Sequence, residues 1–387
     1  MYKNLYVLGH DANARLLISQ LSFAIDKSKT SLALLFNDET TLKDYIIGGS
    51  TVSYENRMSK RNPLIKTNNF KASIYPVRNK FQNNIASVSN NNPHIDNLII
   101  TNRSCQNSNI LNIYKRNISE NTNILFLNPG LGVIDTVLKE SWGSNSSLYP
   151  NVFQGVSNHI IESGNNFKVR HYKAGNIKIS AYPNKSESYL QFMKFQESYF
   201  PNDTDVPEMV TDLIDSPMLN ALYTPFKDVL GAQIEKLIID ACIIPLVILL
   251  NCSYKDISTS SHTGNTISRL LDECIYVLLS VPYVKQLIKV DPTTNLIFDK
   301  QRLFDMVFQT AKQYDRCSPP IIDTNSDIGI EGNSVGNVSD ILYVNGYIRA
   351  LAQRINFNAS ANDTLLEMVQ AKRNLKSKYD SNMTIIT

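Results

Sequence analysis

The chain opens with an apolar strand that runs through a tight turn into a helix. The strand is predicted over Leu5–Leu8, in the context of the fingerprint G-x-G-x-x-G, whose glycines let the backbone approach a pyrophosphate. The first glycine, Gly9, is present, but Asp11 and Ala14 stand at the second and third positions. The predicted cofactor-binding turn is therefore degenerate and consists of Gly9, His10, Asp11 and Ala14.

The second glycine position decides which ligand such a turn can accept. A side chain there keeps the backbone away from a pyrophosphate, and the carboxylate of Asp11 would also repel its negative charge. We therefore expect no dinucleotide cofactor and a fold that serves another role.

Four strand-like runs and an intervening helix predict an α/β arrangement in the first half of the chain. The strands are predicted at Leu5–Leu8, Ser31–Phe36, Asn97–Thr101 and Asn123–Leu127, and the helix at Asn13–Ala24. Strand, helix and strand in this order indicate a parallel βαβ unit. Ligands of such sheets bind at the carboxyl ends of the strands.

A polar turn follows the last of these strands. It contains Asn128 and Gly130, which are therefore candidate cofactor-binding residues. Short alternating segments between residues 150 and 185, such as Ile177–Tyr182, are expected to be edge strands, and a helix is expected at Glu187–Gln196.

From about Tyr223 onward the apolar periodicity is helical. Helices are predicted at Val229–Leu250, Thr266–Leu279, Lys300–Lys312, Asp340–Ile355 and Ala361–Lys378. A stretch rich in turn-forming residues, Ser318–Val338, predicts a long loop. The chain is thus predicted to form a Rossmann-like α/β domain over residues 1–222 and an all-α domain over residues 223–387.

The longest apolar run is too short to cross a membrane. Leu237–Leu250 contains Asp240 and Pro245, and a membrane-spanning helix needs about 20 apolar residues. We interpret the run as a buried core helix that is kinked or broken before Pro245. The first strand begins so near the start of the chain that no targeting presequence is expected there.

The cysteines and histidines indicate a reducing compartment and no metal site. The five cysteines are odd in number and lack the paired spacing of zinc ligands, so they are expected to be reduced thiols. The five histidines have no ligand spacing either.

Three runs in the second half resemble signatures of the ketopantoate reductase superfamily. They are Gln233–Leu246, Asp340–Tyr347 and Leu365–Val369, and with the N-terminal strand and turn they span nearly the whole chain. The resemblance implies a Rossmann-like domain followed by a helical domain like the C-terminal domain of 6-phosphogluconate dehydrogenase. It also implies one candidate function, the NADPH-dependent reduction of 2-dehydropantoate in pantothenate synthesis, in the cytoplasm.

The resemblance places the reductases' catalytic residues at two positions. The lysine that protonates the substrate carbonyl falls at Lys236, and the glutamate that binds the reacting hydroxyl falls at Asp340, which is one methylene shorter. Two substrate-binding asparagines correspond to Asp240 and Ile244. A proton donor must lie within about 2.6–3.2 Å of its acceptor, so the shorter carboxylate alone can spoil the geometry.

Cofactor-binding positions of the reductases differ as well. An asparagine and glycine correspond to Pro129 and Gly130, with Asn128 one place early. A lysine corresponds to Arg103, and the arginine that grips the 2′-phosphate of NADPH corresponds to Asn37. These changes together favour a pseudoenzyme in which Lys236 and Asp340 are vestigial.

Three further runs resemble a non-enzymatic branch of this superfamily, the fungal mitochondrial translational activators of cytochrome b messenger RNA. They are Asn121–Pro129, Pro150–Gly155 and Leu296–Phe304, whereas Gly130–Gly132 and Tyr343–Gly346 are nearer to the reductases. The resemblance implies a matrix protein peripheral to the inner mitochondrial membrane. Its implied partners are the 5′ leader of the message, the mitochondrial ribosome and a second activator; a homo-oligomer is compatible with both functions.

The distribution of charge is compatible with an RNA role. No acidic residue lies between Glu55 and Asp96, and this interval holds Arg57, Lys60, Arg61, Lys66, Lys71, Arg78 and Lys80 with Phe70, Tyr75 and Phe81 between them. A second acid-free stretch, Asn165–Ser186, is also basic. Cations can bind phosphates and rings can stack on bases, but a solvated loop explains the same pattern.

Two of the candidate catalytic residues also have plain structural explanations. Lys236 and Asp240 are spaced to form an ion pair along one helix face, and Asp340 follows Ser339 where a helix N-cap is expected. The sequence therefore leaves two hypotheses: a cofactor-free translational activator and an NADPH-dependent reductase.

Overall fold

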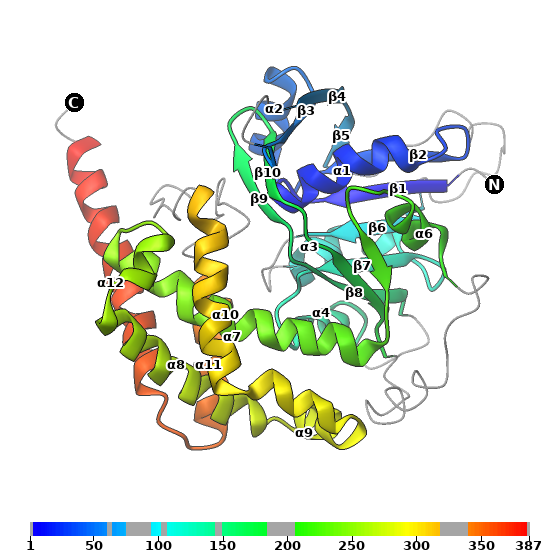
Figure 1. Cartoon of the computed structure of the whole chain (residues 1–387). Helices are drawn as coiled ribbons and strands as arrows, with labels where there is room; N and C mark the ends of the chain where they lie inside the picture. The colour runs from blue at the N-terminus through cyan, green and yellow to red at the C-terminus, as the bar shows by residue number, and fades with distance from the viewer. Residues whose placement is uncertain are drawn as a thin grey trace. The chain divides into compact units, whose positions relative to one another are not determined.

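A computed structural model describes residues 3–59, 64–74, 94–101, 107–143, 149–183, 206–317 and 340–384. These residues form two units (Figure 1). The first contains residues 3–159, 164–183 and 206–229, and the second contains residues 160–163 and everything from 230 onward. The first unit is α/β and the second is mostly helical, so the predicted fold class is confirmed.

The first unit is organised around an eight-stranded sheet with the order β12-β11-β8-β7-β6-β1-β2-β5. Its strands are β1 (Lys3–Leu8), β2 (Thr30–Leu35), β5 (Lys71–Ser73), β6 (Asn97–Ile100), β7 (Asn123–Leu127), β8 (Asn151–Ser157), β11 (Ile177–Ala181) and β12 (Ala221–Tyr223). All neighbouring strands are parallel except β11 and β8. The predicted βαβ unit is β1, α1 and β2.

Helices cover this sheet. They are α1 (Ala12–Ala24), α2 (Glu39–Ile47), α3 (Asn107–Tyr114), the short η2 (Lys115–Asn117), α4 (Val133–Trp142) and α6 (Glu208–Ile214). α1 contacts α6, while α3 contacts α4. One strand face, which includes Leu8, Ile100 and Phe126, packs against Leu111 of α3 and Val137 of α4 in a single buried cluster.

A smaller sheet of four strands was not predicted. Its order is β4-β3-β10-β9, from β3 (Thr51–Asn56), β4 (Leu64–Asn69), β9 (Ile160–Gly164) and β10 (Lys168–Lys173). α1 contacts both β3 and β10, so this sheet packs against the helix that follows the degenerate turn.

The expectation that Ile177–Tyr182 is an edge strand is wrong. β11 lies between β8 and β12, because Ala221–Tyr223 pairs with it in parallel. A three-residue strand is too short to give a detectable alternation, so its presence outside β11 could not be read from the sequence.

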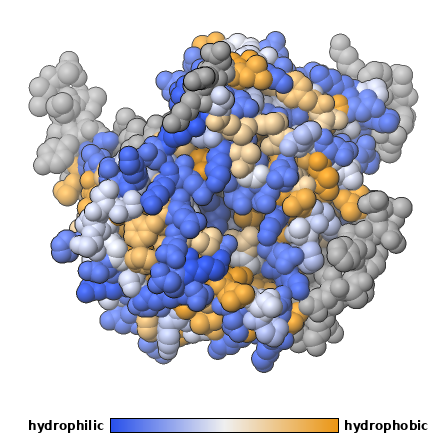
Figure 2. Space-filling view, viewed as in Figure 1, coloured by the Kyte–Doolittle hydropathy of each residue, from blue (hydrophilic) through white to orange (hydrophobic). Residues whose placement is uncertain are grey.

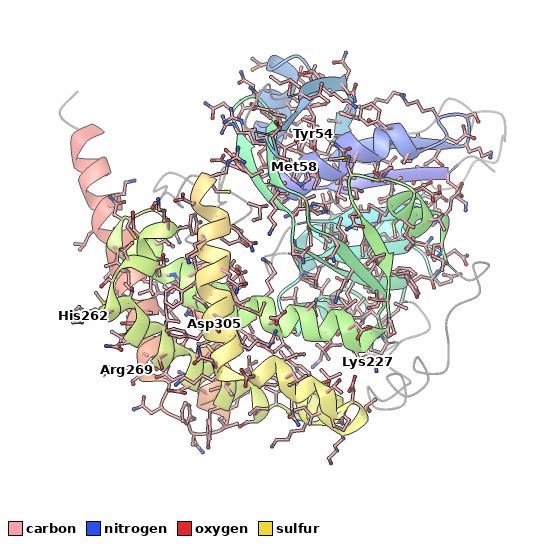
Figure 3. The ribbon with its side chains drawn as sticks, in the orientation of Figure 1. Tyr54, Met58, Lys227, His262, Arg269 and Asp305 are labelled. Atoms are coloured by element: carbon pink, nitrogen blue, oxygen red, sulfur yellow. The ribbon has the colours of Figure 1, made fainter. Side chains whose placement is uncertain are left out.

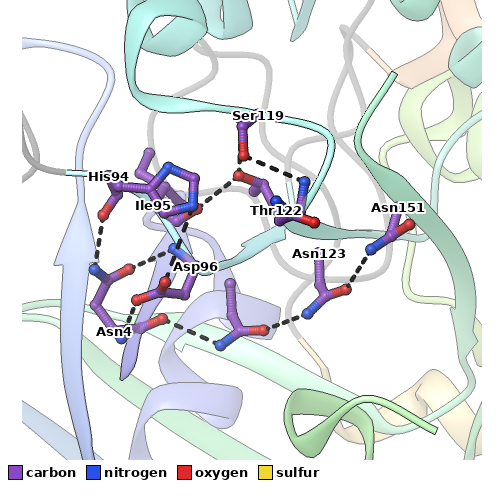
Figure 4. A network of polar contacts seen from close by, with 10 residues as sticks. Asn4, His94, Ile95, Asp96, Ser119, Thr122, Asn123 and Asn151 are labelled. Atoms are coloured by element: carbon purple, nitrogen blue, oxygen red, sulfur yellow. Dashed lines mark hydrogen bonds and ion pairs between the residues drawn. The ribbon is translucent and has the colours of Figure 1, made fainter. Parts of the chain in front are cut away.

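Asparagine side chains link the strands near their amino ends (Figure 4). Asn97, Asn123 and Asn151 are paired in register on β6, β7 and β8. Asn151 donates to Asn123 Oδ1 (3.2 Å), and Asn123 donates to Asn97 Oδ1 (2.9 Å). Asn97 then donates to the carbonyl of Asn4 on β1 (3.3 Å), so the amides form a ladder across four strands.

The second unit consists of helices. They are α7 (Phe226–Leu250, which begins in the first unit), η5 (Lys255–Thr259), α8 (Ser261–Leu279), α9 (Pro282–Val290), η6 (Pro292–Phe298), α10 (Lys300–Gln313), η7 (Tyr314–Arg316), α11 (Asp340–Arg354) and α12 (Ser360–Thr384). α8, α11 and α12 contact one another. The predicted loop Ser318–Val338 and the predicted helix Glu187–Gln196 lie outside the described residues.

α7 is a buried helix, as expected, but it is not broken before Pro245. A proline removes the hydrogen bond to the carbonyl four residues earlier, which here belongs to Ala241. The side-chain amide of Asn345 on α11 donates to that carbonyl at 3.0 Å. The carbonyl therefore keeps a donor, and the helix continues through the proline.

The same amide belongs to a buried network between three helices. Asn345 also donates to Asn362 Oδ1 (3.0 Å), and Asn362 donates through its side chain to Glu273 (2.8 Å). Glu273 on α8 accepts from the backbone N–H groups of Ala361 and Asn362 as well, at 2.8 and 2.9 Å. The carboxylate thereby caps the first turn of α12.

The four described cysteines, Cys242, Cys252, Cys274 and Cys317, are free thiols, as predicted. Burial raises the pKa of Cys242 and Cys274, which keeps both thiols protonated. Among the described helices, none is long and apolar enough to span a bilayer.

Candidate functional site

The turns that follow neighbouring parallel strands meet at the carboxyl edge of the large sheet. Because β7, β6, β1 and β2 are adjacent, this edge brings together Asn128, Thr101, the Gly9–Asp11 turn and Asp38. This is where a sheet of this kind binds a dinucleotide.

The first glycine of the motif is required by its backbone. Gly9 has a φ of 133°, a conformation that other residues rarely adopt, and its N–H donates to Leu35 O at 3.0 Å. The turn between β1 and α1 therefore keeps the shape of a dinucleotide-binding turn at this residue. At the third glycine position of the motif, the side chain of Ala14 is completely buried.

Asp11 occupies the N-terminus of α1. Its Oδ1 accepts hydrogen bonds from the backbone N–H of Ala14 (2.9 Å) and from Thr101 Oγ1 (2.7 Å), and its Oδ2 accepts from Asn13 Nδ2 (3.2 Å). A helix N-terminus binds anions through such N–H groups, and in dinucleotide-binding folds the anion is the pyrophosphate. The carboxylate of Asp11 thus supplies a negative charge at the N-terminus of α1 itself.

The arginine on the helix that follows this turn points into the protein. Arg15 is only 2% exposed, and its Nε donates to the carbonyl of His10 at 2.8 Å. Its Nη1 donates to the carbonyls of Gly164 (2.7 Å) and Lys168 (3.0 Å), and the guanidinium lies 4.9 Å from the ring centre of Phe167. Arg15 therefore joins α1 to the small sheet and cannot reach a phosphate without leaving these contacts.

A second carboxylate follows β2 and was missed in the sequence. Asp38 accepts from the N–H of Thr41 (2.7 Å) and caps α2. Burial alone would raise the pKa of Asp38, but hydrogen bonds from Thr40 and Thr41 and the nearby His10 lower it. In dinucleotide-binding folds, an acidic residue after this strand accepts from the ribose 2′-hydroxyl of NAD, whereas the Asp38 carboxylate accepts from the first turn of α2. The N-cap pattern of an aspartate before Glu39–Thr41 was the signal that could have revealed it.

Asn128 and Gly130 follow β7, as predicted, but the amide of Asn128 is engaged. Its Oδ1 accepts from the backbone N–H of Ser157 at 2.8 Å, and the residue has a φ of 53°. A side chain on Gly130 would meet Val133 at 3.0 Å. Asn128 therefore ties the end of β7 to β8, and Gly130 is needed where the turn comes close to Val133.

The helix that contains Lys236, α7, carries an ion pair. Lys236 Nζ lies 3.5 Å from Asp240 Oδ2, one turn apart on α7, and the Asp240 side chain is 9% exposed. Ile244, at the position of a substrate-binding asparagine in the reductases, is buried in an apolar cluster with Ile248 and Leu366. Asp340 is the first residue of α11, and its side chain lies outside the described part of the chain, as does Arg103.

Two arginines of the predicted RNA surface are paired with one acidic residue where the structure describes it. Arg57 and Arg170 both bind the buried carboxylate of Glu55, at 2.7 and 3.6 Å. The expectation that Phe70 could stack on a base is wrong, because its ring is buried. Lys66 and Lys71 remain exposed, while Lys60, Arg61, Tyr75, Arg78, Lys80 and Phe81 lie outside the described residues.

Two of the five histidines, His171 on β10 and His159, form a buried relay with Tyr54 of β3, the residue labelled in Figure 3. Tyr54 Oη lies 3.0 Å from His171 Nδ1, and His171 Nε2 lies 3.1 Å from His159 Nδ1. His159 Nε2 is 2.8 Å from the carbonyl of Leu219. No group of three or more histidine, cysteine or acidic side chains in the described ranges could hold a metal ion.

Two family models match most of the chain. The model for ketopantoate reductase PanE/ApbA matches residues 48–184, and the model for the C-terminal part of the same family matches residues 228–373.

Relatives of both predicted kinds are similar to this chain. A probable 2-dehydropantoate 2-reductase of Schizosaccharomyces pombe is 24% identical and covers 97% of this chain and 98% of its own. A 2-dehydropantoate 2-reductase of Saccharomyces cerevisiae is 27% identical over 48% of each chain. The cytochrome B translational activator CBS2 of the same yeast is 23% identical over 95% of each chain.

Solved structures share the fold. A D-mandelate dehydrogenase in complex with NADH and anilino(oxo)acetate matches with a TM-score of 0.64 at 14% identity, over 96% of this chain and 98% of that one. A PanE/ApbA family ketopantoate reductase from Ralstonia eutropha JMP134 matches with the same TM-score of 0.64 at 14% identity, over 97% and 99%.

Proposed function

Because this chain belongs to the ketopantoate reductase superfamily, we propose that it is a member without reductase activity. Its role is that of a mitochondrial activator of cytochrome b translation, and it needs no dinucleotide cofactor. The observation that carries this proposal is the carboxylate of Asp11 bound to the N-terminus of α1.

The physical reason is that the anion site is already filled. A dinucleotide would have to displace the carboxylate from Ala14 N–H and Thr101, and then approach an uncompensated negative charge. Asp38, next to the position of the arginine that grips the 2′-phosphate in the reductases, adds a second carboxylate after β2 and supplies no cation.

The lysine helix supports the same proposal. The Lys236 ammonium faces Asp240 in an ion pair, and that carboxylate stands where an acidic keto acid would bind in the reductases. Ile244 contributes no hydrogen-bond donor, since it packs in the helical core. The similarity to CBS2 over nearly the whole chain agrees with a translational role.

The proposed partners follow from that role. They are the 5′ leader of the message, bound directly or through another protein, the mitochondrial ribosome and a second activator. The proposed location is the matrix, peripheral to the inner membrane.

An NADPH-dependent 2-dehydropantoate 2-reductase in the cytoplasm is the second candidate. Two observations favour it: Lys236 is retained on α7, and the S. pombe relative is named as a probable enzyme of this kind. Under this function, Lys236 would protonate the substrate carbonyl.

A titration separates the two functions. Purified full-length chain is titrated with NADPH and with NADH, and turnover of ketopantoate is measured on the same sample. We expect neither saturation nor turnover. The matched variant Asp11→Gly opens the turn, so a gain of dinucleotide binding in this variant identifies the carboxylate as the block. Micromolar binding and turnover by the wild-type chain would establish the reductase instead.

A translation assay provides the positive result. Mitochondria from cells that carry the gene or lack it are labelled with radioactive amino acid during protein synthesis. We expect loss of newly made cytochrome b while other mitochondrial products persist. Unchanged cytochrome b synthesis contradicts the activator role.

A further inference from the structure

The two edges of the small sheet differ in exposure. Every residue of β9 is buried, whereas β4 is exposed along its length apart from Asn68. Leu64 and Ile65 are 56% and 52% exposed, on opposite faces of the strand. Apolar side chains reach the surface in this region, around α2, β3 and β4 (Figures 1 and 2).

The register fixes which backbone groups face outward. Phe70 N–H donates to Ser50 O at 3.2 Å, and Ser53 N–H turns the other way, to Phe167 O at 3.3 Å. Thr67 is the partner of Ser53, and hydrogen-bonded and non-bonded pairs alternate in antiparallel strands. The N–H and C=O groups of Ile65 and Thr67 therefore point away from β3. Within the described ranges, no strand pairs with that side of β4.

The features that usually keep an exposed edge strand from pairing with another strand are weak in β4. The pairing with β3 runs through six consecutive residue pairs without a bulge. The strand has a central lysine, but Lys66 Nζ lies 4.7 Å from the ring centre of Phe23 on α1, and Asn68 donates to Ser22 on the same helix. The edge thus presents a straight row of backbone groups.

The charge around the strand selects an acidic partner. No acidic residue occurs between Glu55 and Asp96, and the carboxylate of Glu55 is buried between two arginines. Among the described residues from Asn56 to Ser73, the exposed charged residues are Lys66 and Lys71. Complementary charge steers a segment with several carboxylates toward this edge.

The same observations weigh against other occupants. RNA binding would use exposed rings together with cations, but Phe70 is buried, and two of the cations, Arg57 and Arg170, bind Glu55. A second copy of β4 in the register that pairs Ile65 with Thr67 would bring the two Lys66 side chains opposite each other. We propose that the outer edge of β4 docks an extended, acidic segment of a partner protein, which adds a strand beside Leu64–Asn69.

Peptide display on the full-length chain tests this docking edge. A library of random linear peptides on phage is panned against the immobilised protein, and enriched peptides are synthesised with a fluorescent label and titrated by anisotropy. We expect sequences in which Asp or Glu alternates with apolar residues. Ile65→Pro, which removes an outward N–H, should weaken their binding about tenfold, whereas the matched control Ile65→Val keeps the affinity within about twofold.

Amide hydrogen exchange tests the same geometry without a variant. Bound peptide should slow exchange at Ile65 and Thr67 and leave Lys66 and Asn68 unchanged, since the latter amides already face β3. The proposal is overturned if no peptide is enriched, if enriched peptides lack acidic residues, or if they bind Ile65→Pro as tightly as wild type. Protection of Ile65 and Thr67 by a single-stranded RNA oligonucleotide, or by self-association of the chain, would overturn it equally.

Discussion

The side chain of Asn345 donates a hydrogen bond to the carbonyl of Ala241, the group that Pro245 deprives of its helical donor. The two elements involved, α11 and α7, are far apart in sequence, so a tertiary contact completes a secondary structure. The relationship makes the proline and the asparagine energetically dependent on each other.

Replacing Asn345 should therefore destabilise the protein less when Pro245 is also replaced. Asn345→Ala leaves a buried carbonyl without a donor, at a cost of about 1–3 kcal/mol. In the Pro245→Ala background, the restored backbone N–H can bond Ala241, so the same change costs less. A double-mutant cycle measured by urea unfolding should give a coupling of about 1 kcal/mol, and strictly additive effects would refute the relationship.

The cap on α1 should depend on the hydrogen-bonding atoms of Asp11 rather than on its charge. Asp11→Asn keeps an acceptor for Ala14 N–H and should change stability by only a few tenths of a kcal/mol, whereas Asp11→Ala should cost about 0.5–2 kcal/mol. Thermal unfolding of the two variants side by side provides the measurement. Equal stability of both variants would show that the contact with the helix contributes nothing.

The free energy of unfolding should decrease as the pH falls from about 6.5 to about 4. These limits are the reference pKa of histidine and the pKa of His171 in the folded protein. Burial, followed by the charge of His159, lowers the pKa of His171 to about 4, and burial lowers the pKa of His159. Within this window the unfolded chain takes up protons at a higher pH than the two buried rings of the folded state do. The free energy of unfolding then decreases by up to about 1.4 kcal/mol per pH unit for each histidine.

Two histidine variants isolate this effect. Across that pH window, His171→Gln removes one titrating group and should flatten the slope of stability against pH. His262→Gln, at an exposed position on α8, is the matched control and should leave the slope unchanged. Parallel slopes in all three proteins would exclude the buried relay as the source.

Loss of Lys236 should leave the cellular role intact. Lys236→Ala removes the partner of a largely buried carboxylate, so some stability is lost, and Lys236→Ala with Asp240→Asn should recover it. Respiratory growth of a strain that depends on this chain should persist in both variants. Complementation of a pantothenate auxotroph by the wild-type chain, abolished in Lys236→Ala, would assign the lysine to catalysis.

The sequence predicted the elements whose periodicity is strong. Asn123–Leu127 was located to the residue, and α10 was predicted within one residue at its end, because each has a regular apolar pattern and clear boundaries. The small sheet was missed, since strands such as β4 carry polar residues on an exposed edge and show no alternation. β12 was missed because it is three residues long.

The position of the candidate turn could be predicted from the sequence, but the contacts of its residues could not. The degenerate turn was identified because its spacing is local. The bond from Thr101 to Asp11, and the capture of two arginines by Glu55, join residues that are distant in sequence and carry no pattern. The count of charges along the two basic stretches therefore overstated the positive surface, because it included Arg57 and Arg170, which pair with Glu55 in the fold.

Under the proposed function, Asp11 has a consequence for how the protein persists in the cell. A protein that binds a nicotinamide nucleotide gains folding stability in proportion to the logarithm of the nucleotide's concentration, so its survival against proteolysis follows metabolism. With a covalently attached carboxylate in the anion position, this chain holds its anion at every nucleotide concentration. Its abundance should then stay constant when starvation or oxidative stress depletes the nicotinamide pool, a property suited to a factor that must be present before respiration begins.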